Sequence, residues 1–189
     1  MQELVHYADP MTRAMRTQAI LDVYQIPHRK VLVEVRKGDH KKAEYGDINP
    51  LRKVPALAHG DTLIIESGAI TLYLADLFAE KMKTPKPGTP ERARLYEWLF
   101  FLQSTLEPVA IKAFDPDQKE TAKVEVRRLL DSMGSKVTGP YILGEEMTVA
   151  DVIVFTELSW YKSMGTFPEG LEPYVSFMAR VAAQLKTPA

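Results

Sequence analysis

In the first eighty positions, segments with the apolar spacing of β-strands and segments with the apolar spacing of α-helices follow one another. Short runs rich in β-branched residues predict strands, and they end at turn signals such as Gly60-Asp61. Helical spacing from about Thr12 predicts a helix that ends at Pro27, and a second helix follows from Ser67 to Phe78. The predicted strands cover residues 4–7, 31–35, 54–58 and 62–65, with a loop and a short helix at 38–50.

The pattern changes after a segment rich in proline and glycine at residues 83–90, because only helices are predicted beyond it. Thr89 is the expected N-cap of a helix with Pro90 at its first position. Pro108 and the turn Asp115-Pro116-Asp117 are expected to end this segment. Further helices are predicted at 120–137, from a capping box of Thr148 and Asp151 onward, and at 171–185.

These elements predict an α/β N-terminal domain at residues 1–80, a linker at 81–89 and an all-α C-terminal domain at 90–189. The pattern alone does not define one fold, because several families combine such domains.

Composition and charge narrow the classes of function. The formal net charge of −1 gives no reason to expect nucleic acid or an anionic membrane as a partner. The chain has no cysteine, which excludes disulfides, thiolate metal sites and a cysteine nucleophile. We see no signal peptide and no apolar run of membrane-spanning length, so we expect a cytoplasmic protein. We also expect that the protein holds no metal.

Three segments carry a resemblance to a known family. They are NPLRKVPAL at residues 49–57, LIIESGAITLYL at 63–74, and YILG at 141–144 followed by TVAD at 148–151. In this order and at this spacing they resemble the glutathione transferase superfamily, its bacterial, phi-like and theta-like members in particular. The resemblance covers nearly the whole chain, and it implies a thioredoxin-like N-terminal domain followed by the all-helical domain.

The resemblance also implies where glutathione binds. The Val54–Pro55 peptide is expected to be cis, with Val54 offering its backbone to the extended tripeptide. Glu66 would take the ammonium of the γ-glutamyl group, and Ser67 its carboxylate. From the residues alone, an ordinary trans proline and a serine cap beside a solvated glutamate remain alternatives.

Cations near the glycyl carboxylate are expected in the segment Gly38 to Lys42 and just before the proline. By resemblance to phi-like and theta-like members, His40, Lys41 and Lys53 are the candidates. A solvated charged loop is the alternative interpretation of all three.

The residue that activates the thiol is expected to be Thr12. The family often has serine at this place before the first helix, and a hydroxyl donor at a helix N-terminus favours thiolate over thiol. Thr12 is also a candidate helix cap, and both roles are compatible. Tyr7 is the alternative, because other classes of the family use a tyrosine near the end of the first strand; a simple packing role is the other interpretation of Tyr7.

The resemblance therefore predicts a homodimeric glutathione transferase. Glutathione is its expected co-substrate, and a hydrophobic electrophilic small molecule its second substrate. Two alternatives stay open: another glutathione-dependent reaction, of isomerase, dehalogenase or etherase type, and a non-catalytic binding or assembly module. Threonine at position 12 and a short helical half keep the last of these open.

Overall fold

The structure, a computed structural model, describes residues 2–10 and 12–186. Contacts within the chain divide it into two units, Met1–Lys81 and Met82–Ala189. Each unit has its own hydrophobic core, and we describe the two in turn.

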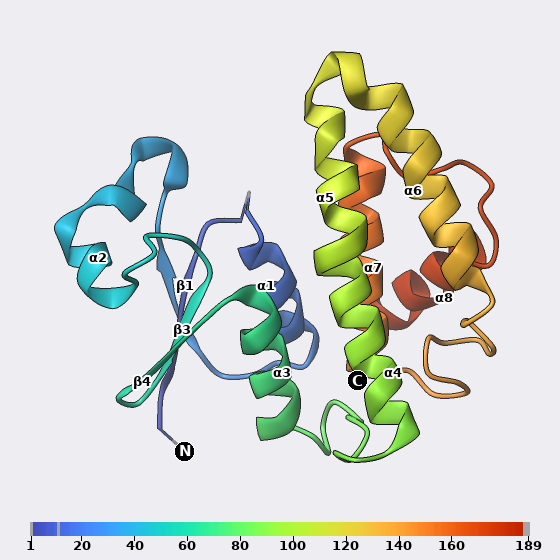
Figure 1. Cartoon of the computed structure of the whole chain (residues 1–189). Coiled ribbons are helices and arrows are strands. Elements are labelled where there is room, and N and C mark those ends of the chain that lie inside the picture. Colours follow the sequence, from blue (N-terminus) through green and yellow to red (C-terminus); the bar gives the residue numbers. More distant parts are fainter. Residues whose placement is uncertain (1, 11, 187–189) are drawn as a thin grey trace. The chain divides into compact units, whose positions relative to one another are not determined.

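The first unit is built on one four-stranded sheet (Figure 1). The strand order is β2-β1-β3-β4; β1 and β2 are parallel, whereas β1–β3 and β3–β4 are antiparallel. The parallel pair needs a crossover, and the predicted first helix supplies it. The strands are β1 (Leu4–Ala8), β2 (Arg29–Leu32), β3 (Ala56–His59) and β4 (Thr62–Ile65).

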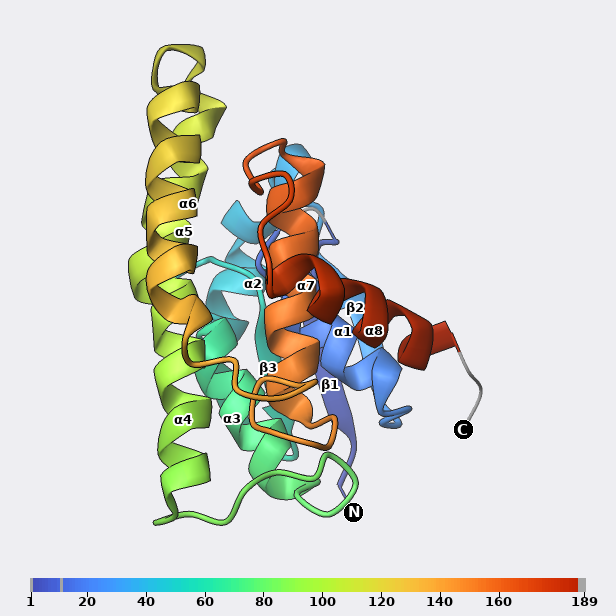
Figure 2. The same ribbon diagram turned by 90° about the vertical axis from the view of Figure 1, so that its right-hand side faces the viewer.

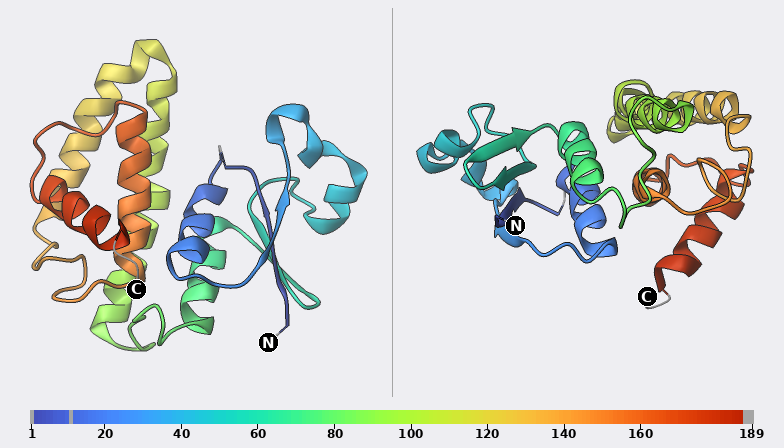
Figure 3. Two further views of the ribbon diagram at one scale, coloured as in Figure 1. Left: turned by 180° about the vertical axis from the view of Figure 1, so that it is seen from behind. Right: turned by 90° about the horizontal axis from the view of Figure 1, so that it is seen from below.

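Helices cover both faces of this sheet (Figures 1 and 3). α1 (Ala14–Val23) and α3 (Ser67–Leu77) pack together on one face, and α2 (Ala43–Ile48) lies on the other. Successive residues of a strand point to opposite faces. Accordingly His6 lies against Thr17 of α1, whereas the ring of Tyr7 lies 6.2 Å from that of Tyr45 on α2.

The strand predicted at residues 31–35 is shorter and starts earlier than expected, because β2 ends at Leu32. Val35 begins a 3₁₀ turn instead, and its N–H donates to Asp9 Oδ2 at 2.8 Å. The N–H of Glu34 donates to Asp39 Oδ2 at 3.1 Å. The N–H groups of Glu34 and Val35 thus donate to side-chain carboxylates and not to a neighbouring strand. The hydrophobic pattern of the segment does not predict these hydrogen bonds.

The second unit is all-helical (Figure 2). Thr89 Oγ1 accepts from the N–H of Arg92, so the predicted N-cap is confirmed. The capping box of Thr148 and Asp151 is confirmed as well. The helices are α4 (Pro90–Phe100), α5 (Glu107–Ala110), α6 (Lys119–Gly134), α7 (Val149–Ser163) and α8 (Tyr174–Lys186).

The first predicted segment ends at the turn that begins at Asp115, as expected, because the helical run stops at Phe114. The prediction that Pro108 also ends it is wrong. A π-helical stretch, Phe101–Leu106, joins α4 to α5, and Pro108 lies inside α5 (Figure 1). Proline lacks an N–H, and its ring collides with the carbonyl four residues back in a regular α-helix. The wider π turn directly before it relieves that collision, so the helix continues.

The core of the second unit follows the predicted apolar stripe. Leu95, Trp98, Leu99, Leu102 and Leu106 are each at most 1% exposed. Buried residues of α7 and α8 complete this core: Val152, Val154, Leu158, Tyr161, Tyr174, Phe177 and Val181.

The predicted combination of an α/β unit with an all-α unit is confirmed. The bounds 1–80 and 90–189 and the linker at 81–89 stay a prediction. Within the described residues, none of the helices has both the length and the apolar character needed to span a membrane.

Candidate functional site

Strand register brings the predicted site segments to one edge of the sheet. Tyr7 pairs with Ala56, and Ala56 pairs with Ile65. The end of β1, the start of β3 and the end of β4 therefore lie side by side. As a result, the chain after Tyr7, the peptide before Ala56 and the residues after Ile65 converge on the same edge.

The segment before β3 is held in place at its backbone. Val54–Pro55 is cis, as the resemblance implied. Tyr45 Oη and Asn49 Nδ2 both donate to the carbonyl of Lys53, each at 2.7 Å. Burial raises the pKa of Tyr45 to about 12, which keeps this donor protonated. Two hydrogen bonds on one carbonyl thus fix the strand edge directly before Val54.

Glu66 and Ser67 occupy the start of α3. Glu66 is the N-cap residue, with a φ of 70°, a conformation that non-glycine residues seldom adopt. Ser67 is the first residue inside the helix, so the alternative of a serine cap is wrong. No described side chain caps this helix. The first N–H groups of α3 are therefore available to an anion.

One residue of this site escaped the sequence analysis. Arg16, on α1, is only 5% exposed, and its Nη1 lies 3.5 Å from Ser67 Oγ. Sequence alone offers a weak signal for it, namely a charged residue on the face of α1 that also carries Ile20.

The three predicted cations lie on two neighbouring loops. Lys41 and Lys53 are exposed, whereas His40 is half-buried. Arg52, with a φ of 52°, donates from Nη1 to the carbonyl of Lys41 and so ties these loops together. His40 Nδ1 is buried and has no hydrogen-bond partner among the described residues. Sequence analysis did not identify Arg52, whose role depends on the folded loop.

Thr12 lies just before α1, whose N-cap is Arg13. Its Oγ1 accepts from the N–H of Ala14 at 3.2 Å and donates to the carbonyl of Asp9 at 2.7 Å. The N-cap of α1 is therefore Arg13 and not Thr12, one residue later than expected. Thr12 nevertheless accepts from the N–H of Ala14, the first residue of the helix. The hydroxyl proton is directed to Asp9, and it must turn away to reach another acceptor.

Tyr7, the alternative to Thr12, lies on the other face of the sheet. It contacts Tyr45 on α2, and it is half-buried. The neighbouring His6 points to α1. Tyr7 therefore packs against a different helix from the one that Thr12 precedes.

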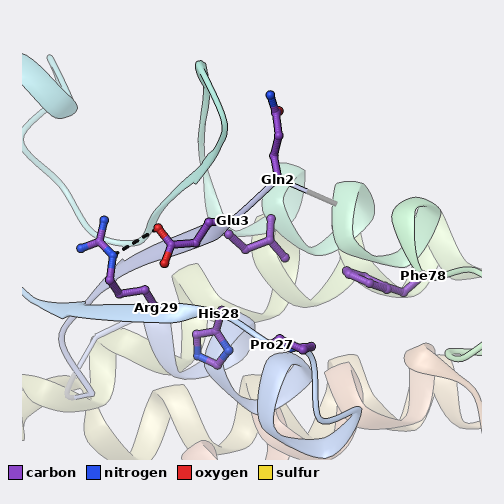
Figure 4. A pocket seen from close by; sticks show the side chains of 7 residues that line it. Gln2, Glu3, Pro27, His28, Arg29 and Phe78 are labelled. Carbon is purple, nitrogen blue, oxygen red and sulfur yellow. Dashed lines mark hydrogen bonds and ion pairs between the residues drawn. The ribbon is translucent and has the colours of Figure 1, made fainter.

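A hollow in the first unit contains none of the predicted residues; it is lined by Gln2, Glu3, Leu4, Pro27, His28, Arg29 and Phe78 (Figure 4). Glu3 Oε2 and Arg29 Nε form an ion pair of 3.4 Å beside it. Val5 pairs with Arg29, so this hollow adjoins the start of β1 and lies away from the edge where Tyr7 meets Ala56. No cluster of histidine and carboxylate side chains suited to a metal ion occurs among the described residues.

Taken together, a mixed four-stranded sheet with helices on both faces and a separate helical unit define a thioredoxin-like domain joined to an all-α domain. Residues 3–76 match the family model described as glutathione S-transferase, N-terminal domain. The chain is 34% identical over 152 residues to glutathione S-transferase GstA of Escherichia coli O157:H7, which covers 75% of this chain and 76% of that protein. The chain belongs to the glutathione S-transferase family.

Solved structures agree with this assignment. A glutathione transferase from Methylococcus capsulatus is similar with a TM-score of 0.81 and 26% identity, covering 95% of this chain and 93% of that one. A human theta-class glutathione transferase has a TM-score of 0.84 and 25% identity, covering 97% and 82%. That human structure is a complex with the glutathione conjugate of 1-menaphthyl sulfate.

Proposed function

We propose that the protein is a glutathione transferase, which activates the thiol of glutathione for attack on a hydrophobic electrophilic small molecule. The observation that carries the proposal is the convergence of three segments at one sheet edge: the chain that leads to Thr12, the Val54–Pro55 peptide, and the uncapped start of α3. Membership of the glutathione S-transferase family supports it.

In this proposal glutathione lies along the edge as an added strand. Its γ-glutamyl end binds at α3, where the carboxylate of Glu66 pairs with the ammonium. Ser67 and the free N–H groups of the first turn bind the carboxylate. The backbone of Val54, next to Pro55, pairs with the cysteinyl residue.

The glycyl carboxylate is expected to bind the cations of the two loops. Lys41 and Lys53 contribute point charges, and the carbonyl of Lys41 is held by Arg52. His40 adds a ring nitrogen that lacks a partner among the residues described.

The chemistry requires the thiol to lose its proton to water. The thiolate sulfur then donates its electron pair to the electrophilic carbon and forms a C–S bond, and the leaving group departs with the electrons of the bond that breaks. Thr12 lowers the thiol pKa by donating its hydroxyl proton to the sulfur, which requires rotation away from the Asp9 carbonyl. The N-terminus of α1 adds positive potential.

An ultraviolet titration of thiolate absorbance tests this proposal. In the wild-type complex the thiol of glutathione should ionise about one to two units below the value of about 8.5 for a free cysteine thiol. Thr12→Val, which keeps the shape but removes the hydroxyl, should return the pKa toward the free value. At a pH below both thiol pKa values, where glutathione binds as the thiol, it should leave the Kd nearly unchanged. Thr12→Ser is the matched control and should keep the lowered pKa. Absence of glutathione binding to the wild-type protein would show that the proposed function is wrong.

One observation favours a second candidate, a glutathione-binding module without thiol activation. Thr12 already donates its hydroxyl proton to Asp9 at 2.7 Å, the length of a strong O–H···O bond. If that bond persists in the complex, glutathione binds with an unshifted thiol pKa, and Thr12→Val changes nothing in the titration.

Other properties are proposals that follow from the family. We expect a homodimer in the cytoplasm, with the first helices of the second unit at its interface. Phe100, on α4, is 58% exposed and is therefore the apolar residue chosen for substitution on these helices. Light scattering on the purified protein should give the mass of a dimer, and Phe100→Glu should shift it toward the monomer. Isomerase, dehalogenase or etherase chemistry on the same bound thiolate is distinguished by identifying the products from a panel of electrophiles.

A further inference from the structure

Arg16 is a buried cation within hydrogen-bond distance of the proposed ligand site. It is 5% exposed, and its Nη1 lies 3.5 Å from Ser67 Oγ, a residue fifty-one positions away in the sequence. The two residues belong to α1 and α3, which pack together on one face of the sheet. Burying a guanidinium costs free energy unless its N–H groups find partners, and the hydroxyl of Ser67 is one of these partners.

The chemistry of a serine hydroxyl shows what this contact does. A hydroxyl has one proton to donate and lone pairs that accept. Since Arg16 can only donate, Ser67 Oγ is the acceptor of this contact, and the proton of Ser67 stays available for another acceptor. Ser67 also lies inside the helix rather than at its N-cap, so its oxygen does not serve as a helix cap.

The charge of Arg16 acts in the same direction. The first N–H groups of α3 carry the positive end of the helix dipole, and no described side chain caps them. A buried guanidinium beside these groups adds positive potential in a region of low dielectric, where it stabilises an anion more than a surface cation does.

We propose that Arg16 is a positioning residue for the glutathione site. It holds Ser67 Oγ as an acceptor, directs the Ser67 proton to the γ-glutamyl carboxylate, and supplies positive charge beside that carboxylate. This inference rests on the proposed function, but it concerns the binding of one carboxylate and not the activation of the thiol.

The test measures glutathione affinity in Arg16→Met, which keeps much of the apolar stem and removes the guanidinium. The glutathione Kd should rise about 10- to 100-fold, as expected for the loss of a charge-assisted contact. The kcat at saturating glutathione should change less than about twofold, because Arg16 does not touch the sulfur. Arg29→Met is the matched control, since Arg29 lies away from the site edge in an exposed ion pair.

A ligand that lacks one group separates positioning from a structural role. In γ-aminobutyryl-cysteinyl-glycine, only the α-carboxylate of the γ-glutamyl group is missing. Wild-type protein and Arg16→Met should bind this analogue with Kd values within about twofold of each other, because the analogue lacks the carboxylate on which Arg16 acts. A merely structural loss would weaken both ligands equally, and that result would overturn the proposal.

Arg16→Lys keeps the charge and loses the planar fork, so it should show a smaller loss for glutathione than Arg16→Met. If Arg16→Met does not fold, Arg16→Lys decides the question by the same comparison of the two ligands. Equal affinity of wild type and variant for glutathione would contradict the role of Arg16 while the function stands. Failure of the wild-type protein to bind glutathione would instead contradict the proposed function.

Discussion

The starts of α3 and α7 pair the same kinds of side chain, a hydroxyl and a carboxylate, with opposite results. At α7 the carboxylate of Asp151 accepts from the N–H and the hydroxyl of Thr148, and from the N–H of Ile142. At α3 no described side chain caps the helix, and Glu66 is exposed. The difference teaches that a helix start closed by its own residues is structural, whereas an open one is a candidate ligand site.

The largest change in the free energy of unfolding is expected from a substitution that removes the capping box at the start of α7. Asp151 is fully buried, and Asp151→Ala leaves the N–H groups of Ile142 and Thr148 without an acceptor. The free energy of unfolding should fall by about 3 kcal/mol or more, because each buried unsatisfied donor costs about 1–3 kcal/mol. Urea denaturation measures this loss. An unchanged midpoint would show that the buried box is dispensable, contrary to the comparison.

Low pH should act on the first unit through a different buried polar residue. His6 is fully buried; its Nδ1 lies 3.0 Å from Gln18 Oε1 and its Nε2 2.8 Å from Thr17 Oγ1. Burial is the largest reason that the pKa of His6 falls from 6.5 to about 4. Since this folded pKa lies below the unfolded one, the unfolded state takes up the proton first, and stability is lost as the pH falls from 6.5 toward 4.

The loss assigned to His6 amounts to about 3 kcal/mol over this window, at 1.36 kcal/mol for each pKa unit. Denaturation at a series of pH values should show a shallower slope in His6→Gln than in the wild-type protein. Equal slopes in the two proteins would mean that His6 does not control acid stability.

A smaller effect on stability, and a larger one on binding, is expected at the open start. Ser67→Ala should raise the glutathione Kd about tenfold, the loss of one charge-assisted hydrogen bond. The free energy of unfolding should fall by about 1–2 kcal/mol, less than at Asp151, because only one buried donor, the guanidinium of Arg16, loses an acceptor. Calorimetric titration and urea denaturation give the two values. A large loss of stability with unchanged affinity would make Ser67 structural and erase the contrast with Asp151.

The contrast also explains what the sequence could predict. Hydrophobic spacing locates α3 and α7, and the acid three residues after Thr148 predicts the closed box. Family motifs point to Glu66, Ser67 and the cis Val54–Pro55 peptide.

The contacts that distinguish the two helix starts depend on residues far apart in the chain. Arg16 reaches Ser67 across fifty-one positions, and Arg52 reaches the carbonyl of Lys41. Neither pair has a periodic or local signature. The π-helical stretch before Pro108 is not predicted for a related reason. Rules based on local sequence describe how proline breaks a regular α-helix, and they do not predict the wider turn that accommodates it.

The smallest effect is expected at α4, whose start is closed like that of α7 but lies at the surface. Thr89 Oγ1 accepts from the N–H of Arg92 at 3.2 Å. Thr89→Ala should lower the free energy of unfolding by about 1 kcal/mol, because water replaces the lost cap in part. Thr89→Ser keeps the oxygen and should stay close to the wild-type value. Glutathione affinity should be unchanged in both variants, since a capped helix start offers no free N–H groups to an anion. A weakened glutathione affinity in Thr89→Ala would contradict the rule that only the open start of α3 serves the ligand.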